Sequence, residues 1–224
     1  MLIGCNPPQF EGSRLDTQPD QKPAKYINSP DSPVYSKGEN LYGLYEARQA
    51  MRAEGRVVVV EGNIDVLMVA QAGLEAVVAP MGTALTAEQC RLIRRFVTRA
   101  VLIYDGDTAG RAAARKGAEL CLSEGLQTTV VTLPDGDDPD TYVATHGAHA
   151  LIRLVDEATP AWTFLVEDAR RESEYDRDPS AAVPRIIDRL VPVADAIPDR
   201  RERELRGRGG SPPERRGRRA EVYW

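Results

Sequence analysis

The sequence predicts an α/β fold in which a parallel β-sheet is flanked by helices and followed by a small helical segment. The first observation is a series of short, continuous apolar runs, which are typical of parallel strands buried on both faces. The second is that stretches with helical periodicity separate these runs, so that strands and helices alternate along the chain. The expected strands cover residues 56–61, 76–80, 99–104 and 128–133.

Helices are expected before, between and after these strands. Thr86 and Gln89 form a plausible capping box at the start of one helix, and Gly125 stands where the helix before it should stop. Pro192 should kink the last helix. The expected helices cover residues 41–53, 64–72, 86–97, 109–124, 139–145, 148–158, 162–171 and 181–196.

The two ends of the chain differ from this alternating pattern. Residues 1–33 are polar and rich in proline, which indicates loop or extended structure. Residues 200–224 hold nine Arg and four Glu without apolar periodicity, and we expect this basic tail to be disordered. The whole chain carries a net charge of −5, so any nucleic-acid contact must use local basic patches or bound metal ions.

Composition also bounds the location and the metal chemistry. No apolar run approaches the roughly 20 residues that span a bilayer, and the start lacks the features of a signal peptide, so we expect a cytoplasmic protein without a membrane partner. The three cysteines form no CxxC pair, so no zinc site is expected. We interpret Cys90 and Cys121 as small core residues, and we expect neither His146 nor His149 to be catalytic or to bind metal.

Acidic clusters follow three of the expected strands. The carboxyl ends of neighbouring parallel strands meet at one edge of a sheet, where α/β proteins bind their ligands. Carboxylates that converge there repel one another unless a divalent cation lies among them. The pattern therefore predicts a magnesium-type site and phosphoryl or phosphodiester chemistry. The clusters are Glu61 with Asp65, Asp105 with Asp107, and Asp135 with Asp138 and Asp140.

Two other interpretations of these carboxylates stay open. Asp and Gly commonly occupy turns and helix N-caps, and this explanation suffices for any one cluster taken alone. An acidic calcium or phosphate-acceptor site is the second alternative, although no Glu stands at the twelfth position from Asp105 or Asp135, as an EF-hand requires. Three clusters at the same end of successive strands favour the metal site.

The motifs resemble one known family, the bacterial replicative DNA primases of the DnaG type. Glu61-Gly-Asn-Ile-Asp, Tyr104-Asp-Gly-Asp-Thr-Ala-Gly-Arg and Leu133-Pro-Asp-Gly-Asp-Asp-Pro-Asp resemble their Toprim domain. Toprim domains also occur in topoisomerases and nucleases, but the last two of these motifs together with Lys25-Tyr-Ile-Asn-Ser-Pro upstream narrow the resemblance to primases. The similarity covers about residues 12–198.

The resemblance implies RNA primer synthesis on single-stranded DNA during replication, by metal-dependent nucleotidyl transfer from ribonucleoside triphosphates. Glu61, Asp105 and Asp107 would be the catalytic, metal-binding carboxylates. Asp138 and Asp140 would complete a site for two Mg²⁺ or Mn²⁺ ions. Because Glu61 stands alone at its strand end, we hypothesise that it also transfers a proton.

Four further residues are candidates for contact with template or nucleotide. Lys25, Tyr26 and Lys37 match positions that the family links to this contact, since lysine offers a charge to phosphate and tyrosine a face for stacking. Without the resemblance they would be ordinary loop residues. Arg111 could reach a phosphate, or could equally form an ion pair on a helix surface.

The resemblance also implies a domain organisation and a truncation at both ends. Residues 1–54 would be a remnant of the amino-terminal part of the polymerase core, 55–140 the Toprim domain, 141–198 a helical subdomain and 199–224 a disordered basic tail. The zinc-binding domain and the domain that binds the replicative helicase are not found in this sequence. We expect the fragment to bind Mg²⁺ or Mn²⁺ weakly and to prime poorly or not at all alone.

Two alternative functions are kept. A Toprim-type nuclease would cut DNA with the same metals, whereas a topoisomerase would need a catalytic tyrosine in a separate domain. A non-catalytic module could bind nucleotides at the same site without making primers.

Overall fold

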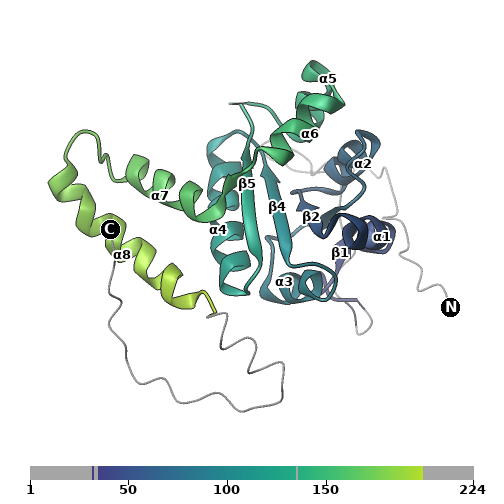
Figure 1. Ribbon diagram of the computed structural model, residues 1–224, viewed down its shortest axis with the longest axis horizontal. Helices are drawn as coiled ribbons and strands as arrows, with labels where there is room; N and C mark the ends of the chain where they lie inside the picture. Colours follow the sequence, from purple (N-terminus) through teal and green to yellow (C-terminus); the bar gives the residue numbers. More distant parts are fainter. Residues whose placement is uncertain (1–31, 33–34, 135, 199–224) are drawn as a thin grey trace, which may run out of the picture.

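The sheet has the predicted parallel centre and two short antiparallel edges (Figure 1). The computed structural model describes residues 32, 35–134 and 136–198. Six strands follow the order β1-β3-β2-β4-β5-β6, in which the first and last pairs are antiparallel and the others parallel. The strands are β1 (Leu41–Tyr42), β2 (Arg56–Val59), β3 (Val77–Pro80), β4 (Arg99–Tyr104), β5 (Gln127–Thr132) and β6 (Thr159–Pro160).

Every expected helix is present, with ends that differ by at most three residues from the prediction. The capping box is confirmed: the Gln89 amide donates to Thr86 Oγ1 at 3.2 Å, and the Thr86 amide donates to Gln89 Oε1 at 3.0 Å. The helices are α1 (Leu44–Glu54), α2 (Asn63–Gln71), α3 (Ala87–Arg94), α4 (Thr108–Ser123), α5 (Pro139–His146), α6 (Ala148–Asp156), α7 (Ala161–Glu172) and α8 (Pro179–Ala196).

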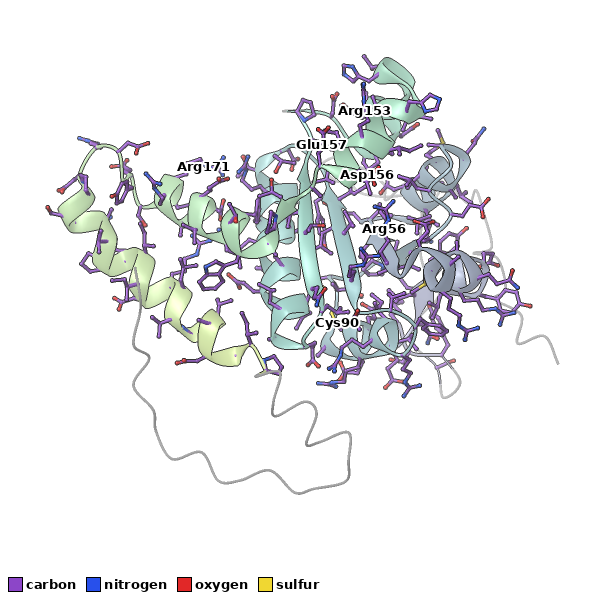
Figure 2. The ribbon with its side chains drawn as sticks, in the orientation of Figure 1. Arg56, Cys90, Arg153, Asp156, Glu157 and Arg171 are labelled. Atoms are coloured by element: carbon purple, nitrogen blue, oxygen red, sulfur yellow. The ribbon has the colours of Figure 1, made fainter. Side chains whose placement is uncertain are left out.

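Helices cover both faces of the sheet, which explains the unbroken apolar runs. Val57 and Val59 pack on the side of α1, α3 and α4, whereas Val58 and Val60 pack on the side of α2 and α6. All four valines are fully buried. Cys90 on α3 and Cys121 on α4 are confirmed as core residues, with their Sγ atoms 3.7 Å apart (Figure 2 labels Cys90).

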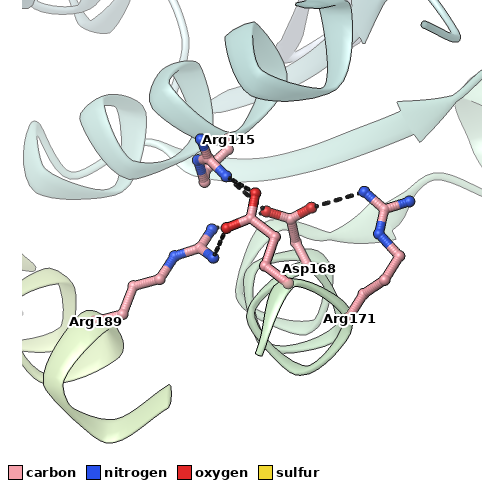
Figure 3. A network of polar contacts seen from close by, with 5 residues as sticks. Arg115, Asp168, Arg171 and Arg189 are labelled. Atoms are coloured by element: carbon pink, nitrogen blue, oxygen red, sulfur yellow. Dashed lines mark hydrogen bonds and ion pairs between the residues drawn. The ribbon is translucent and has the colours of Figure 1, made fainter. Parts of the chain in front are cut away.

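The last two helices extend away from the sheet on the side of α4 (Figure 1). Helix α8 continues through Pro192, and the kink expected there stays a prediction. An ion-pair cluster joins α4, α7 and α8 around Asp168, whose side chain is 1% exposed (Figure 3).

No helix in the described ranges is long and apolar enough to cross a membrane. The predicted tail, residues 199–224, lies outside those ranges.

Candidate metal site

The predicted carboxylates follow three adjacent strands of the sheet. Because β4 pairs in parallel with both β2 and β5, the loops after these strands lie side by side at one edge. Glu61 lies just beyond β2, Asp105 directly follows β4, and Asp138 precedes α5 in the loop after β5. We call this edge the acidic edge. Asp135, the first aspartate of the third cluster, is not among the described residues.

Hydrogen bonds donated by main-chain amides fix the loops of the acidic edge against one another. The Gly106 amide donates to the Asp137 carbonyl at 2.8 Å, and the Asp105 amide donates to Glu61 Oε1 at 3.3 Å. A Cβ atom on Gly106 would lie 2.0 Å from the Pro134 carbonyl oxygen, so only glycine allows this approach. The glycine of the Asp-Gly-Asp motif therefore joins the β4 loop to the β5 loop.

Two of the predicted ligands also cap helices. Asp107 Oδ1 accepts from the Gly110 amide at 2.7 Å at the start of α4. Asp138 Oδ1 accepts from the Thr141 amide at 2.7 Å and from its hydroxyl at 2.5 Å, which lowers the pKa of Asp138. The N-cap interpretation is thus correct for these two residues. It does not exclude a metal, because each carboxylate has a second oxygen.

The other carboxylates of the acidic edge lack a compensating cation among the described residues. Burial raises the pKa of Glu61, and the charge of Asp105 raises it further. Burial also raises the pKa of Asp105, with added repulsion from Asp138 and Asp107. Uncompensated negative charge of this kind is what a bound cation would relieve.

Asp65 is a member of this group that the sequence indicated only weakly. Its Oδ2 accepts from the Gly62 amide at 2.9 Å, so it closes the first turn of α2. Burial, followed by the charges of Asp105, Asp138 and Asp140, raises its pKa to about 6. Its spacing of four residues from Glu61 was the available signal, but the same spacing suits a simple helix cap.

The donor set fits a hard divalent ion, although the side chains do not form a closed cage. Within the described ranges, no three His, Cys, Asp or Glu side chains are grouped so that they could hold a metal ion. Carboxylate oxygens are nevertheless the donors that Mg²⁺ and Mn²⁺ prefer, and Mg²⁺ usually keeps several water ligands and binds through one or two carboxylates. The residues present therefore fit an ion held partly by water.

The four residues predicted to contact template or nucleotide have different outcomes in the structure. Arg111 lines a small cleft with Asp105 and Gly106, and none of the ion pairs found in the described ranges involves it. The Lys37 carbonyl accepts from the side-chain Nε2 of Gln89, a fully buried residue, which fixes this segment to the start of α3. Lys25 and Tyr26 lie outside the described residues.

Comparison with known proteins gives first the class of domain and then the family. A family model described as Toprim-like matches residues 58–143, which contain the sheet centre and the acidic edge. A second model, the amino-terminal domain of the DNA primase catalytic core, matches residues 9–48. The chain therefore contains a Toprim-like domain. It belongs to the DnaG-type DNA primase family and covers part of the catalytic core.

Relatives agree with this assignment. A DNA primase from Aquifex aeolicus is 43% identical over 165 residues, which are 74% of this chain and 32% of the relative. A primase domain from Pseudomonas aeruginosa superposes with a TM-score of 0.72 at 35% identity, covering 84% of this chain and 60% of that one. A DnaG catalytic domain bound to single-stranded DNA gives a TM-score of 0.70 at 35% identity, covering 84% and 61%. The chain thus spans about a third of the first relative's length.

Proposed function

We propose that this chain carries the metal-dependent nucleotidyl-transfer site of a DNA primase, which makes RNA primers on single-stranded DNA from ribonucleoside triphosphates. The observation that carries this proposal is the convergence of Glu61, Asp105 and Asp138 from three adjacent strands. The relatives support it, since they are DNA primases, and one related catalytic domain has been solved with single-stranded DNA.

The residues of the acidic edge would have distinct roles in this reaction. Two Mg²⁺ or Mn²⁺ ions would supply Lewis-acid chemistry at the reacting phosphate, as in other two-metal sites. Glu61, Asp105, Asp107 and Asp138 would hold these ions, with Asp140 nearby in the first turn of α5. Glu61, with its raised pKa, is suited to accept the proton of a primer hydroxyl. Arg111 would contact a phosphate.

The replication partners are part of the proposal. The single-stranded template and the nucleotides would approach the acidic edge, and Lys25, Tyr26 and Lys37 would contact them. A replicative helicase would bind through another part of a full-length primase. We place this reaction in the cytoplasm. Because the chain spans about a third of its relative's length, we expect only weak primer synthesis from this polypeptide alone.

Metal binding needs only residues that the chain contains, so it is the first test. We would titrate Mn²⁺ by calorimetry into wild type and Asp105→Asn/Asp107→Asn. Asparagine preserves the N-cap at position 107, so the helix should remain. We expect the variant to lose at least about tenfold in affinity, because two anionic ligands become neutral.

A matched control carries the same change in charge elsewhere. Asp176→Asn/Asp188→Asn removes two exposed carboxylates beyond α7 and on α8. Equal Mn²⁺ affinity in all three proteins would refute the proposed site. With metal present, labelled DNA and nucleotides then separate the alternatives: extended products support primer synthesis, shortened DNA supports a nuclease, and nucleotide binding without either supports a binding module.

A further inference from the structure

A second charged surface lies at the edge of the sheet opposite the acidic edge. It carries five arginines from α1, the end of α3 and the start of β4. All but one are exposed, and within the described ranges none forms an ion pair. We call this surface the arginine face; it consists of Arg48, Arg52, Arg94, Arg95 and Arg99.

Specific contacts hold the three elements of the arginine face together. The Arg52 guanidinium of α1 lies 5.5 Å from the ring centroid of Phe96, which follows α3. The Arg99 side chain, at the start of β4, donates to the carbonyls of Glu54 and Gly55 at 2.8 and 3.1 Å. Arg48 lies one helical turn before Arg52 on α1.

These contacts leave the positive charge uncompensated. The Arg48 guanidinium lies 4.0 Å from the ring centroid of Tyr45, and a guanidinium stacked on a ring keeps its N–H groups free for other acceptors. Arg99 bonds to neutral carbonyls. Glu54, which lies two residues from Arg52, is already paired with Arg56 at 3.1 Å, and Arg56 is also bonded to Asp156 (Figure 2).

Helix stability explains only part of this arrangement. Arg52 and Arg94 lie in the last turns of their helices, where a cation favours the macrodipole. Arg95 and Arg99 follow α3, and Arg48 lies in the middle of α1. By contrast, Arg91 on the same helix α3 is paired with both Glu88 and Glu124. Five uncompensated charges on one surface of an acidic chain therefore point to an anionic ligand.

We propose that the arginine face binds the phosphate backbone of a nucleic acid. The identity of the polyanion rests on the proposed function. It is supported by the two aromatic rings, because arginine next to an exposed ring such as Tyr45, 59% exposed, suits backbone and base contacts together. The six-residue strand β4 separates this face from the acidic edge by roughly 20 Å. The nucleic acid is therefore held at a place distinct from the metal site.

The test compares two double variants with the same change in charge. Arg52→Glu/Arg95→Glu reverses the arginine face, whereas Arg153→Glu/Arg185→Glu reverses exposed arginines on α6 and α8. Figure 2 shows Arg153 far from Cys90 of α3. Each substitution changes the charge by two units, so both proteins move from −5 to −9.

Binding is measured by fluorescence anisotropy with labelled single-stranded DNA of about 20 nucleotides, in EDTA and at several salt concentrations. EDTA removes divalent ions, so the acidic edge repels phosphate and does not contribute. We expect at least about tenfold weaker binding for the arginine-face variant and less than about twofold for the control. In Arg52→Ala/Arg95→Ala, the negative slope of log K against log salt should become less steep by about 1.4, which corresponds to the loss of two phosphate contacts.

Several outcomes would overturn the proposal. Equal weakening in both charge-reversal variants would mean that only net charge matters, and no binding by the wild type would remove the site. If poly-glutamate displaces DNA at equal or lower charge concentration, an acidic protein is the better partner.

Thermal unfolding verifies that each variant folds, and the alanine variant serves if a glutamate variant does not. A wild type that binds Mn²⁺ but not DNA in EDTA refutes this inference alone, and the converse result refutes the proposed function alone.

Discussion

Carboxylates gather in two regions of this molecule, and the two groups are satisfied in opposite ways. At the acidic edge, Glu61, Asp65 and Asp105 accept main-chain hydrogen bonds or repel one another, and their pKa values are raised. Around Asp168, by contrast, three arginines surround a buried carboxylate (Figure 3). The first group has an excess of negative charge and the second has none.

The contacts of Asp168 show what a structural carboxylate looks like in this fold. Arg189 lies 2.8 Å away, and Arg115 and Arg171 lie at 3.3 Å, so that α4, α7 and α8 are joined. Glu172 pairs with Arg115 and Arg189 as well. Because three arginines face these two carboxylates, no negative charge is left in this cluster for a cation to neutralise. The difference teaches that an uncompensated cluster, rather than acidity itself, indicates a binding site.

The largest expected effect comes from breaking the compensated cluster. Asp168→Asn should reduce the free energy of unfolding by about 2–3 kcal/mol, because Arg115 and Arg189, which are 22% and 23% exposed, lose the buried carboxylate between them. Thermal and urea unfolding measure the change. Asp176→Asn is the control, since this side chain is 98% exposed and only 3.7 Å from Arg170, and it should change stability by less than about 0.5 kcal/mol. A loss below about 1 kcal/mol at position 168 would contradict the structural role.

Removing a negative charge from the acidic edge should increase the free energy of unfolding instead of reducing it. The pKa of Asp65 is raised from 3.8 to about 6, so the folded state binds this proton more tightly than the unfolded state does. Its contribution to stability is therefore complete below about pH 4 and is lost as the pH rises through 6. At pH 7 in EDTA, Asp65→Asn should stabilise the protein by roughly 1–2 kcal/mol, less than the full shift implies because the carboxylate is partly solvated.

The Asp65 experiment has a control and a clear contrary result. Asp188→Asn removes an exposed carboxylate on α8 and should leave stability nearly unchanged between pH 5 and 7. A destabilised Asp65→Asn at pH 7, or the same pH dependence with and without the substitution, would mean that the Gly62 hydrogen bond outweighs the repulsion.

The smallest expected effect concerns the exposed member of the compensated cluster. Glu172 is 50% exposed, although it bonds to two arginines, including Arg189 at 2.6 Å. Glu172→Gln should cost roughly 0.5–1 kcal/mol, and the cost should shrink in high salt, because solvent screens exposed pairs. Measurement of unfolding at low and high salt checks both points. A cost as large as that of Asp168→Asn would show that burial does not distinguish the two carboxylates.

The sequence predicted the fold where local patterns decide it. The four parallel strands and eight helices of the described residues follow from apolar runs and helical periodicity, and the motif at Thr86 located one helix start to within a residue. Strands β1 and β6 were missed because two residues carry no periodicity, and only pairing with β3 or β5 makes them strands. Strand β2 ends at Val59, so Glu61 lies in the loop rather than in the strand.

The sequence also predicted where the carboxylates of the candidate site lie, but it did not predict the buried carboxylate of Asp168. The residues at the strand ends could be located because parallel strands bring their carboxyl ends together. Asp168 could not be found in this way, since Asp-Ala-Arg-Arg-Glu on a helix has the composition of a solvated surface. Its burial depends on α4 and α8, which are distant in the sequence. The metal roles of Glu61, Asp105, Asp107, Asp138 and Asp140 stay predictions.

The two helix caps have a consequence for how strongly an ion could be bound. Asp107 and Asp138 each use Oδ1 to hold a helix start. Folding has thus already removed much of the rotational freedom of both side chains. An aspartate on a mobile loop would lose that freedom only when the ion binds. The cost of ordering the side chain would then lower the affinity of the site for the ion. The N-termini of α4 and α5 therefore act as preorganising supports for the ligands beside them.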